Sequence, residues 1–283
     1  MSDPAGLIAA VVAAAAGAAA GAFVRALTVN GAVAAFCVGV MVFGLGGAGH
    51  AVALVSFFAS SSLLSALGLR IRRRRGASTP VGPARDVWQV AANGLVPALI
   101  ALASALTNPG GTPSSREWLL LSAAALASMN ADTWATEVGG LSRSRPRMMG
   151  TWKPVAAGES GGVTLLGVAA GLAGSLFVAL MVAAWWPVGG AGLIWRPDLG
   201  EVFAVTWAGF LAMLADSILG AGVQARFRCR ACGSTVEERT HCSTRTERVS
   251  GWGVMDNNAV NLTASALGVA FAWILLRWFG GGL

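Results

Sequence analysis

The stretch GGVTLLGVAAGLAGSLFVALMVAAWW, residues 161–186, runs for 26 residues without a charged side chain. At 1.5 Å of rise per residue, a helix of this length exceeds the roughly 30 Å of hydrocarbon in a bilayer. Seven other apolar stretches are long enough, or nearly so, to do the same. Together they give eight predicted spans, near residues 5–27, 32–47, 50–69, 88–107, 118–138, 161–186, 201–222 and 258–279. The sequence therefore predicts an all-α, polytopic transmembrane helical bundle.

The composition of the 283-residue chain supports this fold class. Hydrophobic residues make up 55% and charged residues only 12%, whereas a soluble domain is about 25% charged. These values exclude a soluble enzyme and a disordered chain. The net charge of +7 would also suit a nucleic-acid-binding protein, but in a membrane protein basic loops set the topology and contact anionic lipids. We therefore expect membrane lipids as partners and no nucleic acid.

The distribution of basic residues predicts the orientation. If eight spans alternate, 17 of the 20 Lys and Arg residues fall on one side, and only Arg116, Arg196 and Arg277 fall on the other. The positive-inside rule places the 17 in the cytoplasm and both termini outside. The leader of the first stretch, residues 1–6, has no Lys or Arg, so we expect a span there and not a signal peptide. The sequence thus predicts a multi-pass protein of the cell membrane.

The basic segment RIRRRRGASTPVGPAR, residues 70–85, divides the chain into two parts. We expect it to be a polar cytoplasmic linker on anionic headgroups. Residues 1–84 form a three-span segment with this linker, and residues 85–283 form a five-span catalytic core. The core includes a cysteine-containing cytoplasmic loop at residues 226–250. Glycines in several spans predict close helix packing, namely Gly39, Gly44, Gly167, Gly171 and Gly174.

Small and polar residues enter four spans from the same predicted side. They recur every three or four residues and so share one face of each helix. The stripes are Ser128, Asp132, Ala135 and Gly139; Asp216, Gly220 and Gln224; Asn257, Asn261 and Ser265; and Arg85, Gln89 and Asn93. Glu137 lies about 140° round the helix from Asp132 and need not serve the same site. Asp256 suits either a plain helix N-cap or a member of the site.

The loop between the fifth and sixth predicted spans is basic and rich in glycine. It supplies Arg143, Arg145, Arg147 and Lys153, and then Gly158, Gly161 and Gly162. We expect these glycines to open the sixth span at its cytoplasmic end, where free N–H groups favour phosphate. The alternative is a flexible loop with glycines in its turns. No GxxxxGK[ST] stretch exists, so this is not a P-loop.

We expect the carboxylates of Asp132, Asp216 and Asp256 to converge with the cationic glycine-rich loop, and this combination suits phosphate chemistry. Carboxylates and amides are ligands for Mg²⁺, and cations with N–H groups neutralise phosphoryl oxygens. No GxSxG or HExxH stretch occurs, which points away from hydrolytic triads and zinc proteases. The alternative is that these polar residues only hold helices together in the membrane.

A third motif lies in the loop at residues 226–250. Cys229-x-x-Cys232 is followed by His241 and Cys242, which resembles a compact zinc knuckle. Adjacent His and Cys ligands are geometrically awkward. Structural Zn²⁺, an unmetallated loop and redox work therefore all stay open.

The longest ordered motifs resemble a known family. They are ADTWATEVGGLSRSRPRMM (131–149), GTWKPVAAGESGGVTLLG (150–167), ADSILGAGVQARFRCRACG (215–233) and GWGVMDNNAVNL (251–262). They resemble the integral-membrane family of the plant phytyl-phosphate kinase and the animal transmembrane protein nineteen. The DxxAxxxG pattern of Asp132, Ala135 and Gly139 is also similar to membrane CTP-dependent lipid kinases and cytidylyltransferases, such as dolichol kinase and CDP-diacylglycerol synthase. The resemblance implies an enzyme that uses CTP or another nucleoside triphosphate with Mg²⁺ on an isoprenoid alcohol or its monophosphate.

The hypothesis is therefore a kinase for a phytyl, prenyl or polyprenyl monophosphate or alcohol at the cytoplasmic leaflet. Asp132 and Asp216, with Asp256 as a further candidate, hold Mg²⁺ in this hypothesis. Phosphate-neutralising candidates are Lys153, Arg147 and the amides of Gly161 and Gly162, and substrate-positioning candidates are Asn93, Asn257 and Asn261. Glu137, Gly158 and Gln224 complete the set of binding candidates.

Two other functions stay open. One is a lipid cytidylyltransferase, which releases pyrophosphate. The other is a lipid or isoprenoid transporter without nucleotide chemistry, which would place polar sites at mid-membrane. A homo-oligomer also stays open.

Overall fold

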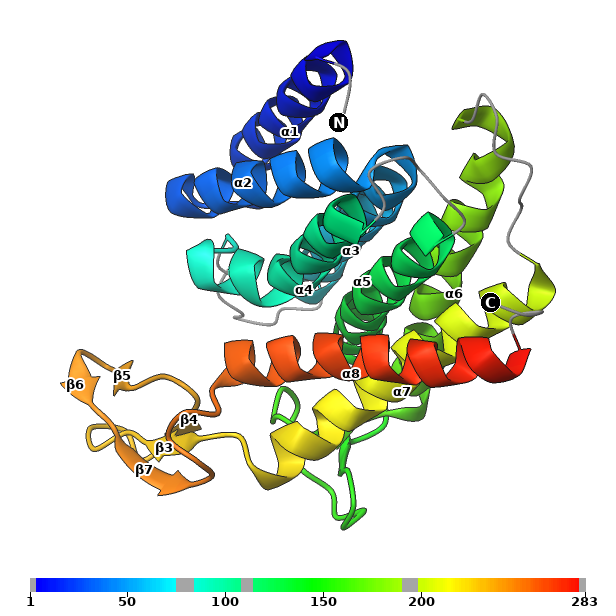
Figure 1. Cartoon of the computed structure of the whole chain (residues 1–283). Coiled ribbons are helices and arrows are strands. Elements are labelled where there is room, and N and C mark those ends of the chain that lie inside the picture. Colours follow the sequence, from blue (N-terminus) through cyan, green and yellow to red (C-terminus); the bar gives the residue numbers. More distant parts are fainter. Residues whose placement is uncertain (1–3, 75–83, 108–113, 190–197, 280–283) are drawn as a thin grey trace.

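The computed structural model of the chain describes residues 4–74, 84–107, 114–189 and 198–279. Within these ranges the chain forms eight long helices (Figure 1). They are α1 (Pro4–Phe23), α2 (Val29–Gly46), α3 (Ala48–Arg74), α4 (Val87–Thr107), α5 (Ser114–Gly139), α6 (Leu165–Gly189), α7 (Leu199–Gly222) and α8 (Asn257–Phe279). All except α5 are long and apolar enough to cross a membrane. The predicted helical membrane fold is confirmed.

Helix α5 lies at the centre of the bundle, packed against α3, α4, α6, α7 and α8 (Figure 1). Every residue from Leu119 to Ala131 is buried. Neighbouring helices therefore surround this stretch, and lipid does not contact it. The charged residues of α5 flank this stretch, with Arg116 and Glu117 before it and Asp132 directly after it, and all three are half-buried.

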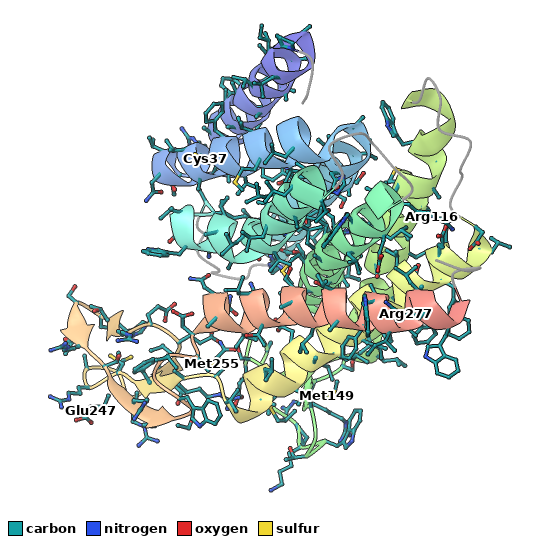
Figure 2. All side chains as sticks on the ribbon, in the orientation of Figure 1. Cys37, Arg116, Met149, Glu247, Met255 and Arg277 are labelled. Atoms are coloured by element: carbon teal, nitrogen blue, oxygen red, sulfur yellow. The ribbon has the colours of Figure 1, made fainter. Side chains whose placement is uncertain are left out.

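The loops gather at two opposite ends of the bundle. At the end that we name the basic end, α3, α5 and α7 terminate and α4, α6 and α8 begin. There Arg72 of α3 forms an ion pair with Glu137 of α5 at 2.8 Å. At the opposite end, Arg116 of α5 pairs with Glu201 of α7. Figure 2 shows Arg116 and Arg277 at this opposite end, far from Glu247 and Met255. The helices thus alternate as the sequence predicts.

Close approach between α5 and α6 depends on glycine. A Cβ atom on Gly167 would lie 2.8 Å from the carbonyl oxygen of Ala135, and one on Gly174 would lie 2.8 Å from the ring of Trp134. Either contact would push the helices apart. The packing role predicted for the span glycines is confirmed. Gly39, Gly44 and Gly171 likewise lie where one helix closely approaches another.

A buried amide, which the sequence analysis did not single out, joins three helices. The Asn130 carbonyl oxygen on α5 accepts hydrogen bonds from Ser60 at 2.8 Å and Ser61 at 3.2 Å, both on α3. Its amide nitrogen donates to the backbone carbonyl of Gly174 on α6 at 2.8 Å. Every polar atom of this fully buried side chain therefore has a partner, as the membrane interior requires.

Several helix boundaries differ from prediction by a few residues, and two of these differences change the interpretation of a loop. Helix α3 continues to Arg74, so the first residues of the predicted linker are helical. Arginine is a good helix former, and the pair with Glu137 fixes Arg72. The rest of that linker, residues 75–83, lies outside the described residues, as does Arg196. Helix α6 begins at Leu165 and not at Gly161.

Short strands occupy two loops at the basic end (Figure 1). In the α5–α6 loop, β1 (Arg147–Met148) pairs antiparallel with β2 (Gly162–Val163). In the loop at residues 226–250, which we name the Cys loop, a sheet of order β4-β3-β7 sits beside a β5–β6 hairpin. These strands are β3 (Arg226–Arg228), β4 (Thr235–Val236), β5 (Thr240–His241), β6 (Thr244–Arg245) and β7 (Glu247–Ser250). None of these strands was predicted from the sequence.

Candidate functional site

Two carboxylates from different helices meet inside the basic end. Asp132 lies about two turns before the end of α5, and Asp216 lies nearly two turns before the end of α7. Their charges interact, and the charge of Glu237 from the Cys loop also acts on Asp216. The Oδ2 atom of Asp216 is buried, and no group in the described part of the chain hydrogen-bonds to it. A buried oxygen without a protein partner is a feature of a ligand site.

The α5–α6 loop is fixed beside this acid pair by Arg226, the first residue of β3. Its guanidinium donates to Glu159 at 3.0 Å, to the Ser160 carbonyl at 2.9 Å and to the Gly220 carbonyl of α7 at 3.3 Å. Ser160 in turn donates to the carboxylate of Glu237. One side chain thus ties together the loop, the end of α7 and the Cys loop.

Gly161 brings the α5–α6 loop into close contact with α7. Its φ is +78°, and a Cβ atom there would lie 2.5 Å from the backbone nitrogen of Ala221 on α7. Only glycine combines this conformation with this approach. The predicted convergence of the glycine turn with the acidic end of α7 is therefore present in the structure.

The glycines do not, however, open a helix. Helix α6 begins at Leu165, and Thr164 caps it by accepting a hydrogen bond from the Gly167 amide at 3.0 Å. The Gly162 amide already donates to the Glu159 carbonyl at 3.0 Å. The prediction that these glycines present helix N-terminal N–H groups to phosphate was wrong, because β2 and a turn come before the helix. Gly158 also has a positive φ, +86°, but lies in open space.

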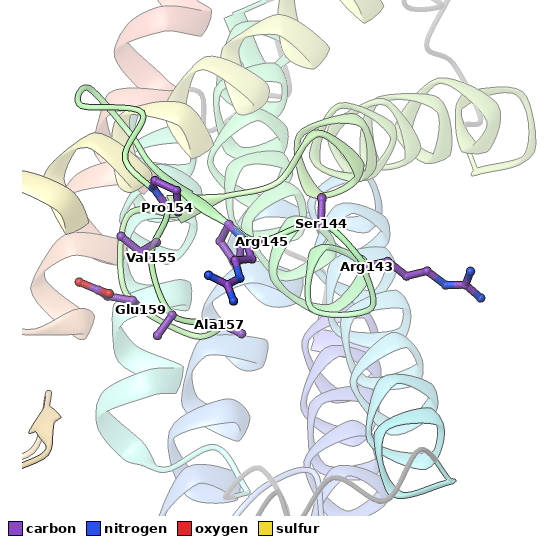
Figure 3. Close-up of a pocket in the computed structure, with 9 residues that line it drawn as sticks. Arg143, Ser144, Arg145, Pro154, Val155, Ala157 and Glu159 are labelled. Carbon is purple, nitrogen blue, oxygen red and sulfur yellow. The ribbon is translucent and has the colours of Figure 1, made fainter.

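Two of the four basic residues of the α5–α6 loop, Arg143 and Arg145, are among the residues that line a hollow of about 560 Å³, which includes neither Asp132 nor Asp216 (Figure 3). Arg145 points into it, whereas Arg143 extends away. Arg147 is exposed and donates to the Trp152 carbonyl at 2.9 Å, within its own hairpin. Lys153 is also exposed. No described contact joins Arg147 or Lys153 to the acid pair, whereas Arg226 contacts the Gly220 carbonyl, one turn after Asp216 on α7.

The other predicted acids have structural partners. Glu137 forms an ion pair with Arg72 and also interacts electrostatically with Arg85. Asp256 is exposed, and its Oδ1 accepts a hydrogen bond from the Ala259 amide at 2.9 Å, as the side chain of an N-cap residue does. Among the described residues, no group of three carboxylates is close enough to hold one metal ion. The structure therefore does not bring Asp256 into a cluster with Asp132 and Asp216.

Two predicted amides carry buried atoms that lack partners in the described chain. They are Oδ1 of Asn93 on α4 and Nε2 of Gln224, just after α7. Asn261 is half-buried on α8, and Asn257 is exposed at its first turn. Asn93 and Gln224 thus keep unused hydrogen-bonding capacity near the basic end, whereas Asn257 faces outward.

The Cys loop brings its four predicted ligands together. Side-chain ligand atoms of Cys229, Cys232, His241 and Cys242 all lie within 4.8 Å of one another. Hydrogen bonding by the Cys232 backbone amide lowers the pKa of Cys229, and the Ser234 hydroxyl lowers that of Cys232. Contact with the Cys232 thiol raises the pKa of Cys242 to about 11. The thiols therefore form one electrostatically linked cluster.

Four residues that organise the site were not proposed from sequence, namely Glu159, Ser160, Arg226 and Glu237. Glu159 and Ser160 lie among the glycines of GESGG, residues 158–162, and this was the one local feature of the sequence that could have indicated them. Arg226 and Glu237 stand among many charges of the Cys loop. Nothing in the sequence alone shows which of them face the membrane site.

Fold and site together define a polytopic helical membrane protein with a polar site at one end. The chain belongs to the DUF92 integral membrane protein family, whose model matches residues 9–269. The family resemblance seen in the motifs is thereby confirmed.

Relatives occur in plants, archaea and cyanobacteria. Protein PGR of Arabidopsis thaliana is 31% identical over 253 residues, 86% of each chain. An uncharacterized membrane protein of Methanocaldococcus jannaschii is 27% identical and covers 70% of this chain and 74% of its own. One from Synechocystis is 31% identical, with 72% and 74% covered. No solved structure matches this chain.

Proposed function

We propose that this protein is a membrane phosphotransferase that uses a nucleoside triphosphate to phosphorylate an isoprenoid monophosphate or alcohol. The observation that carries the proposal is the acid pair. Asp132 and Asp216 come from two helices, their charges interact, and one carboxylate oxygen is buried without a protein partner. Two like charges held together inside a membrane protein are costly unless a cation joins them.

The donor set fits Mg²⁺. This ion is commonly bound by one or two carboxylates together with substrate phosphates and water. Asp132 and Asp216 would hold it, and when bound it would neutralise charge on the transferring phosphoryl group. CTP or another nucleoside triphosphate would be the donor.

The chain's own residues would position the reactants. Arg226 offers a cation at the end of α7, the helix that carries Asp216, and its contacts with Glu159 and two carbonyls hold it in place. Asn93 and Gln224 offer an unpaired acceptor and an unpaired donor. If the acceptor is a monophosphate, its oxygen is already deprotonated, and the transfer needs positioning and charge neutralisation more than a general base.

The depth of the site supports a lipid acceptor. Asp132 lies about two helical turns inside the basic end, so a phosphate headgroup there would leave its apolar chain among the helices. The positive-inside rule places the basic end in the cytoplasm, where nucleotides are available. A water-soluble acceptor would not need a site at this depth.

Labelled nucleotide tests this proposal. The purified full-length protein in lipid nanodiscs is mixed with Mg²⁺ and CTP or ATP labelled at the γ-phosphate. Acceptors are phytyl or geranylgeranyl monophosphate and the matching alcohols. We expect label in the lipid product, with loss of transfer in Asp132→Asn and Asp216→Asn. Glu117→Gln, on the same helix as Asp132 but at the opposite end, is the matched control and should stay active.

Label placement separates the rival functions. Transfer of an α-labelled nucleotidyl group with release of pyrophosphate would replace the kinase by a cytidylyltransferase. Isoprenoid movement across liposomes without nucleotide use would favour a transporter. No transfer to any of these acceptors would contradict the proposal.

A further inference from the structure

We propose that Cys229, Cys232, His241 and Cys242 bind one structural zinc ion that holds the Cys loop against the acid pair. This inference concerns a second site, outside the membrane, and does not depend on the reaction proposed above. Zinc prefers cysteine and histidine ligands in fours when its role is structural.

The distances agree with a tetrahedral site. Zn–S bonds of about 2.3 Å and Zn–N bonds of about 2.0–2.1 Å imply S···N separations of about 3.6 Å at tetrahedral angles. Nδ1 of His241 lies 3.5 Å from Sγ of Cys232 and 3.3 Å from Sγ of Cys242. Because all four ligand atoms lie within 4.8 Å of one another, small side-chain adjustments complete the coordination shell.

The backbone explains how two adjacent residues can both be ligands. His241 and Thr244 pair in the β5–β6 hairpin, and the two residues between them, Cys242 and Ser243, have φ values of +50° and +56°. A two-residue turn with both φ values positive usually takes Asn-Gly or similar residues. Cysteine and serine are strained there. The turn directs the Cys242 thiol back to the His241 ring, and a shared metal would offset the strain.

The first ligand pair lies on a second tight turn. Gly233, directly after Cys232, has a φ of +74°. Its amide donates to the Cys229 carbonyl at 2.9 Å, and the Cys229 amide donates to the Ser234 carbonyl at 2.9 Å. Two turns thus face each other and present all four ligand atoms to one point. A disulfide would use only two of them.

The Cys loop also needs a cross-link to fold. Its strands are two to four residues long, and every residue of β7 is exposed. In residues 226–250 the buried side chains are Phe227 and Cys229. Modules of this size without an apolar core depend on disulfides or metal ions for stability.

The cluster connects directly to the membrane site. Glu237 lies between the two ligand pairs in sequence, accepts a hydrogen bond from Ser160 and acts on Asp216. Arg226, three residues before Cys229, holds the α5–α6 loop. Zinc would therefore set the position of Glu237, which acts on Asp216, and of Arg226, which holds the α5–α6 loop.

Metal analysis of the full-length protein tests the proposal. The protein is purified in detergent through a tag without histidine, and its zinc content is measured by mass spectrometry. We expect close to one zinc ion per chain, and almost none in Cys232→Ser and His241→Ala. The matched control is Cys37→Ser on α2, which should keep its zinc. A Co²⁺-substituted sample should give the visible bands of a tetrahedral thiolate site.

The wild-type result does not depend on whether the variants fold. Wild-type protein without zinc, or with a disulfide among these cysteines by thiol titration, would overturn the site. So would zinc retained in both loop variants. Hydrogen exchange before and after removal of zinc by a chelator tests the connection. We expect faster exchange at residues 226–250 and also at 158–164, and a change confined to 226–250 would refute the positioning role.

Discussion

Replacing Gly161 by alanine should separate the α5–α6 loop from the end of α7. The change adds one methyl group at a residue whose φ is +78°. That methyl group would lie 2.5 Å from the Ala221 backbone nitrogen, whereas ordinary contacts begin at 3.4 Å. Because a Cβ atom has a fixed position on its backbone and the atoms that it meets are the backbone and Cβ of Ala221, no side-chain rotation relieves the overlap, and the two segments must move apart by about 0.9 Å.

Two contributions set the size of the effect. The positive φ costs an alanine about 1–2 kcal/mol, and the overlap adds about 1–3 kcal/mol. Displacements near 1 Å at a reacting centre can lower a rate about a hundredfold. Since Asp216 lies little more than one turn before Ala221 on α7, we expect both a lower melting temperature and a large loss of phosphoryl transfer.

Gly158→Ala is the matched control. Gly158 also has a positive φ, +86°, but nothing lies within 4 Å of an added Cβ atom. It should therefore carry only the conformational cost of about 1–2 kcal/mol and keep its activity within a few-fold of wild type. Melting is followed by intrinsic tryptophan fluorescence in detergent, and transfer by the labelled-nucleotide assay. Equal effects of the two substitutions on both measurements would refute the argument, because the contact with Ala221 would then have no consequence.

Three further substitutions probe separate contacts. Arg226→Gln should speed proteolysis of the α5–α6 loop at a cost of about 1–2 kcal/mol, whereas Arg230→Gln, which breaks the exposed pair with Glu247, should change cleavage little. Asn130→Ala should lower the free energy of unfolding by about 2 kcal/mol, because three interhelical hydrogen bonds are lost. Thr133→Ala, whose hydroxyl donates only within α5, should leave the stability almost unchanged. Equal melting temperatures of the two variants would contradict the role of the Asn130 hydrogen bonds. Asp256→Asn should keep stability and activity because asparagine also caps helices, while Asp256→Ala should lower the stability by about 1 kcal/mol. Loss of metal binding in Asp256→Asn would instead show that Asp256 belongs to the metal site.

The helices were predictable because lipid imposes a simple rule on the sequence. Long apolar stretches and the one-sided distribution of arginine suffice to give eight alternating helices. Helix α5 was also predicted from its apolar residues, although it is the one long helix of the described residues that is less apolar than a membrane span, and its neighbours surround it. Its polar stripe, with Asp132 at the centre, was still recognisable from helical spacing.

The loops were less predictable because their contacts are long-range. The turn at Gly161 packs against Ala221, 60 residues away in sequence, and no local pattern announces this approach. The true start of α6 was hidden by Gly162 and Val163, which are apolar enough to extend the span but form β2. The role of Arg226 depends on two loops folding against each other. From the sequence, an arginine in this loop indicates only which side of the membrane the loop lies on.

The central claim is that Asp132 and Asp216 form one site for a metal-bound nucleotide at the basic end. The most direct measurement is nucleotide affinity of the purified protein with and without Mg²⁺, for wild type, Asp216→Asn and the opposite-end control Glu117→Gln. We expect Mg²⁺-dependent binding in wild type and Glu117→Gln, and its loss in Asp216→Asn. Binding that ignores Mg²⁺, or that survives unchanged in Asp216→Asn, would contradict it.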